Sequence, residues 1–231
     1  MIYAVVTVRN RTKYLRKCLS TIRESLADNV TLVALSSDDY TQHQAVDHYR
    51  DKEADTLILE DGLGCRDHAR LNCRMVDMLG SKYNPKADDI ILLSADDYEY
   101  LSGWRSRLSA FLHDAPVDIA LVSCELEPLF PWNAPKEVIE HGGVRALVRE
   151  TVPGANWAFR WRSWNAVRTM MLTAHDADSL RYDMNTCGLL YGDGYRIAAL
   201  NLADHVGKLD STNGNMSFQV NARPLPAKWQ V

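Results

Sequence analysis

The sequence predicts an α/β protein in which a mostly parallel sheet is flanked by helices. Short runs of β-branched and aliphatic residues alternate with longer segments whose apolar residues recur at helical spacing. Residues 90–93 form an unbroken Ile/Leu run, which is typical of a parallel strand buried on both faces. The chain has 231 residues, of which 46% are hydrophobic, so it is long enough for one domain with a sizeable core.

Five strands are predicted in the first half of the chain, with a helix after each of the first four. The predicted strands are residues 2–8, 30–35, 56–59, 90–93 and 117–122. The predicted helices span 14–22, a polar segment ending at about 50, 66–79 and 101–113. Repeated strand–helix units favour parallel strands, because the crossover helix returns the chain to the edge where the previous strand began.

The second half of the chain has a different composition. Three prolines interrupt residues 128–135, and the pair Gly142-Gly143 between two short segments predicts a hairpin. A helix is expected over about 176–190 and a strand over 195–202, followed by a tail rich in Gly and Asn. We expect a smaller region here, joined to the first half as one continuous unit.

Charge and cysteine content exclude several classes of protein. A net charge of −4 provides no overall attraction to nucleic acid or to an anionic membrane. The five cysteines include no C-x-x-C pair, so we expect reduced, buried thiols rather than a disulfide framework or a zinc site. The first residues lack a basic leader and a cleavage site, and no apolar run reaches the length of a membrane span. A cytoplasmic protein is expected, in the host cytoplasm if the source is viral.

Motifs for the common nucleotide and hydrolase folds are absent, but acidic residues follow two predicted strands. There is no G-x-G-x-x-G, no P-loop lysine motif and no G-x-S-x-G elbow. Asp38-Asp39 follows the second strand and Asp96-Asp97 follows the fourth. Two carboxylates at the carboxyl end of a buried strand suit a hard divalent cation that carries phosphates. The alternative is that Asp96 caps the next helix and Asp97 is solvated.

Six segments, in this order along the chain, resemble a known family. They are residues 5–20 with Asn10-Arg11, Ser37-Asp38-Asp39, Gly64 with 69–72, 92–97 with Gly103-Trp104, Tyr182-Asp183 with 194–197, and 204–207 with Ser211-Thr212. Together they resemble the family-2-like, inverting, metal-dependent glycosyltransferases of the GT-A (Rossmann-like) fold. The resemblance covers most of the chain, although no single segment is specific.

The resemblance implies a role for eight residues. Five would contact the nucleotide-sugar donor: Thr7, Arg9, Asp38, Arg70 and Asp96. Asp97, with Asp96 as the alternative or additional ligand, and His205 would hold Mn²⁺ or Mg²⁺, and Asp183 would be the catalytic base.

The chain departs from the family pattern at two points. The acidic motif stands as Ser94-Ala95-Asp96-Asp97, which leaves the direct metal ligand open between its last two residues, although we favour Asp97. No Glu directly precedes Asp183, so that residue could also be an exposed helix residue. Other structural readings are that His205 is a buried histidine, that Asp38 is a helix cap and that Arg70 decorates a helix face.

The implied reaction is an inverting, single-displacement transfer of a sugar from a nucleotide-sugar donor, UDP-linked, to an acceptor hydroxyl. Residues 1–127 would bind the nucleotide sugar, and 128–231 would bind the acceptor and carry the base. The expected acceptor is a saccharide. One alternative is a hydroxymethylated pyrimidine in phage DNA, because residues 145–168 contain five arginines. Another is a binding module without catalysis. A nucleotidyltransferase would show a Gly-rich loop after the first strand, and residues 7–12 contain none.

Overall fold

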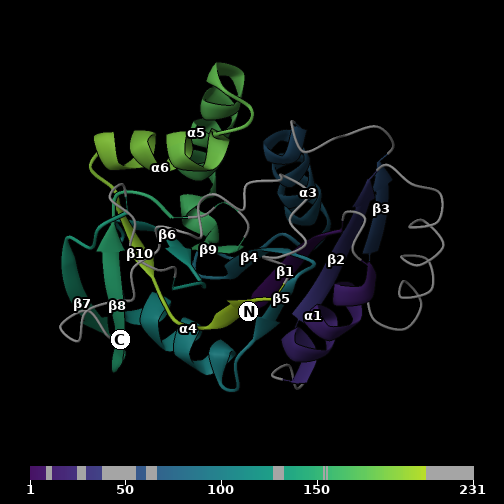
Figure 1. Cartoon of the computed structure of the whole chain (residues 1–231), viewed down its shortest axis with the longest axis horizontal. Helices are drawn as coiled ribbons and strands as arrows, with labels where there is room; N and C mark the ends of the chain where they lie inside the picture. Colours follow the sequence, from purple (N-terminus) through teal and green to yellow (C-terminus); the bar gives the residue numbers. More distant parts are fainter. Residues whose placement is uncertain are drawn as a thin grey trace.

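A nine-stranded sheet runs through the whole molecule between two layers of helices (Figure 1). The computed structural model describes residues 1–8, 12–24, 30–37, 56–60, 67–126, 133–152, 154 and 156–206. The strand order is β3-β2-β1-β4-β9-β6-β10-β8-β7, and a separate two-stranded sheet pairs β11 with β5. The pairings make seven of the nine strands run in one direction, with β9 and β8 reversed. The predicted α/β class with a mostly parallel sheet is confirmed.

Four parallel strands of the first half form one side of the sheet. They are β1 (Ile2–Val8), β2 (Val30–Ser37), β3 (Thr56–Glu60) and β4 (Ile90–Ala95). Along β4, Ile90 and Leu92 enter one hydrophobic core, whereas Ile91 and Leu93 enter the other. The strand is therefore buried on both faces, as its unbroken apolar run predicts.

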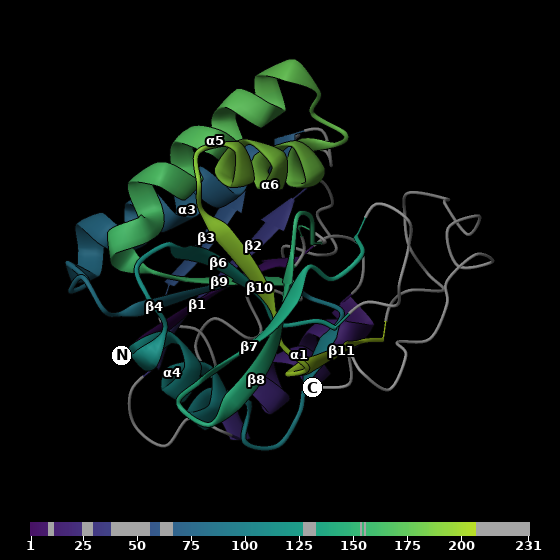
Figure 2. The same cartoon turned by 90° about the vertical axis from the view of Figure 1, so that its left-hand side faces the viewer.

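Helices cover both faces of the sheet (Figures 1 and 2). On one face lie α1 (Thr12–Glu24) and α4 (Trp104–Asp114). On the other lie α3 (His68–Tyr83), α5 (Trp164–Ala177) and α6 (Tyr182–Gly192). Among the described residues, no helix is both long enough and apolar enough to cross a membrane.

The second half adds strands to the same sheet. They are β6 (Ile119–Ser123), β9 (Asn156–Arg160), β10 (Arg196–Ala199), β8 (Val144–Arg149) and β7 (Glu137–His141). The predicted hairpin is β7–β8, and Gly142 and Gly143 both have positive φ at its turn. A Cβ on Gly142 would lie 2.3 Å from the Ala110 carbonyl oxygen, so this turn also packs too closely on α4 for any side chain.

Two predictions for the second half are wrong. Residues 156–160 form strand β9, which lies antiparallel between β4 and β6, where no strand was predicted. The single helix expected over about 176–190 is two helices, because α5 ends at Ala177 and α6 begins at Tyr182. Asp178 at the break has extended backbone angles, and its carboxylate accepts a hydrogen bond from the Leu180 N–H at 3.0 Å.

The structure overturns the capping alternative for the two aspartates after β4. They are followed by a short strand, β5 (Tyr98–Tyr100), and α4 begins only at Trp104, with Gly103 at its N-cap. Asp96 and Asp97 are both 0% exposed, so neither caps that helix or is solvated. Strand β5 pairs antiparallel with β11 (Ala203–His205), with Tyr98 opposite His205.

The described cysteines match the sequence prediction. Cys18, Cys73, Cys124 and Cys187 are buried free thiols. Burial raises the pKa of Cys18 to about 12, so the thiol stays protonated and packs as a small apolar group. Cys65 lies outside the described residues.

Candidate active site

The carboxyl ends of several strands meet at one edge of the sheet. Thr7 near the end of β1 pairs with Ala95 at the end of β4, and Ser94 pairs with Asn156 at the start of β9. Because β9 is antiparallel, its first residue lies where its neighbours end. Ser123 at the end of β6 pairs with β9 at the same level, which brings the segment after β6 to this edge. Ligands bind at such an edge in open α/β sheets.

Four residues form an acidic cluster at this edge: Asp97, Tyr98, Glu125 and His205. The His205 Nε2 lies 2.9 Å from Asp97 Oδ2, and its Nδ1 lies 3.8 Å from Glu125 Oε2. The Tyr98 hydroxyl donates a 2.7 Å hydrogen bond to the same Glu125 oxygen, and the Tyr98 ring stacks on His205 with centroids 4.6 Å apart. Asp97 and Glu125 are buried, whereas His205 is partly exposed. The cluster thus faces solvent through its histidine.

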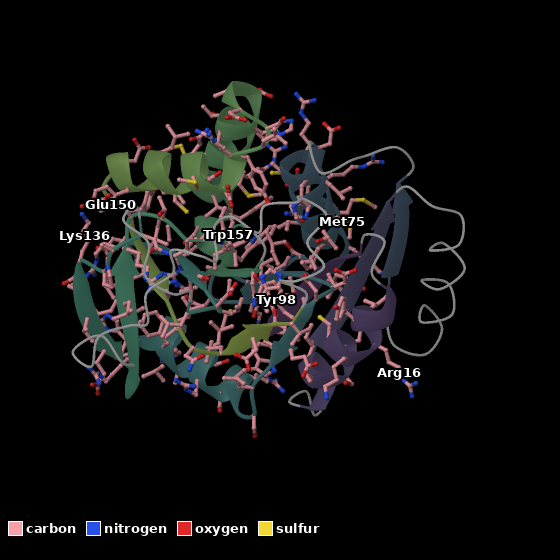
Figure 3. The ribbon with its side chains drawn as sticks, in the orientation of Figure 1. Arg16, Met75, Tyr98, Lys136, Glu150 and Trp157 are labelled. Carbon is pink, nitrogen blue, oxygen red and sulfur yellow. The ribbon has the colours of Figure 1, made fainter. Side chains whose placement is uncertain are left out.

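Tyr98 and Trp157 lie in the middle of the molecule between the helical layers, whereas Lys136 and Glu150 mark the outer side beside β7 and β8 (Figure 3). The cluster therefore lies inside the fold. Its strands β4, β6 and β9 are held by ladders to one another, and β5 is held by β11.

The donors of Asp97 and His205 fit a divalent cation. Two ligands at right angles on a cation with bonds of about 2.0–2.1 Å lie about 3 Å apart, which matches the 2.9 Å between Asp97 Oδ2 and His205 Nε2. In the described part of the chain, no group of three or more His, Cys, Asp or Glu residues is arranged to hold a metal. Two protein donors suffice where phosphate oxygens and water complete the coordination, as is usual for Mg²⁺.

Asp183 lies in the first turn of α6 and is tied to the start of β9. Its Oδ2 accepts a 3.2 Å hydrogen bond from the Gly154 N–H, and its Oδ1 accepts one of 2.8 Å from the Met184 N–H. Burial raises the pKa of this carboxyl above its usual range, although the two backbone hydrogen bonds oppose the shift. A carboxylate with a raised pKa is a better proton acceptor than an ordinary one. Gly154 comes two residues before Asn156, so Asp183 belongs to the same edge as Asp97.

Sequence reasoning missed two residues of this edge. Glu125 follows the predicted fifth strand, but only the strand order brings the end of β6 near Asp97. His68 opens α3, where a lone histidine carries no pattern, yet its ring nitrogens lie 3.1 Å from Thr7 Oγ1 and 3.2 Å from the Tyr182 hydroxyl.

Other predicted site residues are placed elsewhere or cannot be placed. Arg9 and Asp38 lie outside the described residues. Arg70 is on α3 with a side chain 59% exposed, and its guanidinium pairs with Asp176 at 2.9 Å rather than joining the acidic cluster. Asp96 is fully buried in the turn after β4, next to Asp97.

Four of the five arginines in the segment 145–168 are buried or paired within the protein. Arg149 is fully buried, and Arg160 donates to backbone carbonyls, including Ala115 at 2.7 Å and Pro116 at 2.6 Å. Arg162 and Arg168 pair with Asp88 and Asp77. Arg160, Arg162 and Arg168 therefore satisfy backbone carbonyls or pair with carboxylates, whereas Arg145 is exposed. This arrangement offers little support for a phosphate-backbone contact surface in the segment.

An open groove of about 600 Å³ lies on the outer helical layer. It runs between α3 and α5, and Arg74, Met78 and Leu172 are among its lining residues. Of the predicted site residues only Arg70 lines it, so the groove is separate from the carboxyl edge of the sheet.

The fold is similar to that of a solved glycosyltransferase. The structure of the mannosyltransferase PcManGT from Pyrobaculum calidifontis in complex with GDP-Man and Mn²⁺ superposes with a TM-score of 0.56 at 15% sequence identity. The match covers 95% of this chain and 59% of that chain, so this chain spans about three fifths of the neighbour's length. No family model and no curated protein matches the sequence. The chain therefore has a GT-A-type fold.

Proposed function

We propose that this protein is a metal-dependent glycosyltransferase that uses a nucleotide-sugar donor. The observation that carries the proposal is the pair of buried aspartates, Asp96 and Asp97, at the carboxyl end of β4, with His205 in contact with Asp97. The similar fold of a mannosyltransferase solved with GDP-Man and Mn²⁺ supports the same class of reaction.

In this proposal Asp97 and His205 hold Mn²⁺ or Mg²⁺, and Asp96 and Thr7 contact the nucleotide sugar. A bound divalent cation supplies the positive charge that stabilises a departing nucleoside diphosphate. Tyr98 holds the His205 ring in place by stacking on it, and Glu125 fixes Tyr98 by accepting the 2.7 Å hydrogen bond from its hydroxyl. Arg9 and Asp38 retain the donor contacts proposed from the family resemblance.

Asp183 is proposed as the base of an inverting displacement. It takes the proton of the acceptor hydroxyl while that oxygen attacks the anomeric carbon from the face opposite the diphosphate. Its raised pKa and its position at the start of α6 support this role. Because the Gly154 and Met184 N–H groups hold the carboxylate, its oxygens keep a defined direction.

The finer assignments follow the family resemblance. The donor is proposed to be UDP-linked and the acceptor a saccharide. Residues 1–127 are proposed to bind the donor and 128–231 to bind the acceptor. His205 belongs to the second half and Asp97 to the first, so the proposed metal site joins the two.

A thermal-shift screen tests the proposal without a known acceptor. The protein is melted with UDP-glucose, UDP-N-acetylglucosamine or GDP-mannose, each with and without Mn²⁺. A donor at about 100 times its dissociation constant stabilises the folded state by about 2.7 kcal/mol. A shift that requires both Mn²⁺ and one nucleotide sugar is expected. If no donor shifts the melting temperature of the wild type but all shift that of a known glycosyltransferase, the proposal is wrong.

A further inference from the structure

His68 connects two parts of the carboxyl edge, the end of β1 and the start of α6. Its Nε2 is 3.1 Å from Thr7 Oγ1, and its Nδ1 is 3.2 Å from the Tyr182 hydroxyl. The His68 and Tyr182 rings meet edge to face, with centroids 5.9 Å apart. Thr7 lies near the end of β1 and Tyr182 starts α6, so one imidazole links the proposed donor side to the helix that carries Asp183.

The chain of contacts continues from Tyr182 to the Asp183 carboxylate through Gly154. The Tyr182 hydroxyl donates to the Gly154 carbonyl at 3.4 Å, and the Gly154 N–H donates to Asp183 Oδ2 at 3.2 Å. Tyr182 and Asp183, consecutive residues of α6, therefore hydrogen-bond the carbonyl and the N–H of the same glycine. A Cβ on Gly154 would lie 2.4 Å from the Asp183 Cβ, so the glycine and the aspartate are in direct contact.

The proton count at the Tyr182 hydroxyl selects one tautomer of His68. This hydroxyl has two partners, the His68 Nδ1 and the Gly154 carbonyl. A phenol has one proton to donate and two lone pairs to accept with. If His68 carries its proton on Nδ1, then His68 donates to Tyr182, and Tyr182 is left to donate to Gly154. With the proton on Nε2, Tyr182 must donate to His68, and the Gly154 carbonyl no longer accepts a hydrogen bond from the Tyr182 hydroxyl.

The Nδ1–H tautomer also assigns the other end of the chain. Its Nε2 is an acceptor, so the Thr7 hydroxyl donates to it. The opposite tautomer directs the Thr7 proton to the Ser94 carbonyl, which lies 3.4 Å from Thr7 Oγ1. A nucleotide sugar that hydrogen-bonds the Thr7 hydroxyl would therefore act on the series of hydrogen bonds that ends at Gly154.

We infer that His68 is a positioning residue that orients the Asp183 carboxylate through Tyr182 and Gly154, and that it couples this orientation to Thr7. The inference rests on the proposed function, in which Asp183 accepts a proton from the acceptor. His68 itself touches no reacting atom in this scheme. Its effect is on the fraction of time that Asp183 faces the acceptor.

The test uses release of nucleoside diphosphate from UDP-glucose and GDP-mannose with Mn²⁺. His68→Leu and Tyr182→Phe are each expected to lower kcat about 10-fold, the size of one lost hydrogen bond in the reacting geometry, with KM unchanged within about twofold. The double variant should be no slower than either single variant, because both changes break one chain. His68→Asn keeps a donor near the position of Nδ1 and should retain more kcat than His68→Gln, which keeps a group near Nε2.

His141→Leu is the matched control. This histidine also meets an aromatic ring edge to face, that of Phe111, but it lies in β7 on the far side of the sheet. The kcat of His141→Leu should equal that of the wild type. Additive effects of the His68 and Tyr182 changes, or His68→Gln retaining more kcat than His68→Asn, would overturn the inference.

A second measurement separates this inference from the proposed function. The Gly154 amide is followed by NMR-detected hydrogen exchange, which needs no substrate. It should exchange at least about fivefold faster in His68→Leu than in the wild type, and unchanged in His141→Leu. Unchanged exchange in His68→Leu overturns the positioning role. Absence of any nucleotide-sugar turnover by the wild type contradicts the proposed function instead, and the exchange result still decides whether His68 holds Gly154.

Discussion

Two histidines lie at the same edge of the sheet in different chemical surroundings. His205 lies against two carboxylates, with Asp97 at 2.9 Å and Glu125 at 3.8 Å, and its ring is stacked on a tyrosine. His68 lies between two hydroxyls, those of Thr7 and Tyr182, and meets the Tyr182 ring edge to face.

The difference in neighbours favours different roles for the two histidines. Carboxylates around an imidazole attract positive charge, so the cluster around His205 suits a cation. A hydroxyl has no net charge and one proton to donate. The hydrogen bonds around His68 therefore fix the orientation of the groups that they join and do not attract a cation. In the proposed function, this edge of the sheet therefore holds the charge of the leaving group on one side and orients the base on the other.

The largest expected effect is on the base side. Asp183→Asn should lower kcat for sugar transfer or donor hydrolysis about 10²–10⁴-fold, because a general base contributes that much. The thermal shift caused by donor and Mn²⁺ should stay. The control is Asp193→Asn, at the C-cap of the same helix, where the side chain is exposed. Equal turnover by the two variants would remove Asp183 from the proposed role.

The next effect is on the cation side. Asp97→Asn should lower turnover about 10²–10³-fold, a typical loss when one group that stabilises transition-state charge is removed. It should also abolish the part of the donor-induced thermal shift that needs Mn²⁺. Asp114→Asn, at the exposed C-terminal end of α4, is the control. A full Mn²⁺-dependent shift in Asp97→Asn would show that the metal ligand is a different residue, with Asp96 the first to test.

A smaller effect is expected from the residue behind His205. Glu125→Gln should weaken Mn²⁺ binding about 10–100-fold, because a carboxylate close to a ligating histidine fixes its orientation and raises its basicity. The binding can be measured by Mn²⁺ electron paramagnetic resonance titration. Glu99→Gln, on the neighbouring strand β5 and paired with Lys17 at the surface, should not change it. Similar affinities for both variants would contradict the proposed role of Glu125.

The smallest effect is on the pH dependence of stability. Because burial raises the pKa of Asp183, the folded protein binds this proton more tightly than the unfolded chain does. The ionised carboxylate therefore destabilises the fold increasingly as pH rises from the ordinary value of 3.8 through the raised pKa, and constantly above it. Asp183→Asn removes this pH-dependent destabilisation, although its amide NH₂ cannot accept one of the two backbone hydrogen bonds. The melting temperature of the variant should therefore rise by about 2 °C relative to that of the wild type between pH 4 and pH 7. A melting-temperature difference that moves in favour of the wild type between pH 4 and pH 7 would contradict the raised pKa of Asp183.

The sequence by itself determined the class of the fold and the first half of the site. The unbroken run at 90–93 predicts a buried strand, because successive side chains of a strand that is covered on both faces are all buried and therefore apolar. The two aspartates that follow this run therefore lie at the carboxyl edge of the sheet. The two glycines at 142–143 predict the hairpin because its turn needs positive φ. The order of the later motifs placed Asp183 and His205 among the candidates.

Only the tertiary structure decided which strands are neighbours. Strand β9 carries a tryptophan, an alanine and a phenylalanine in succession and is buried on both faces, so it lacks the alternation that marks an exposed strand. Its insertion between β4 and β6 brings Glu125 towards Asp97 and Gly154 towards Asp183. His68 joins the site only because α3 packs over the end of β1. Such contacts between distant segments depend on how the layers pack, and neither periodicity nor local motif encodes that packing.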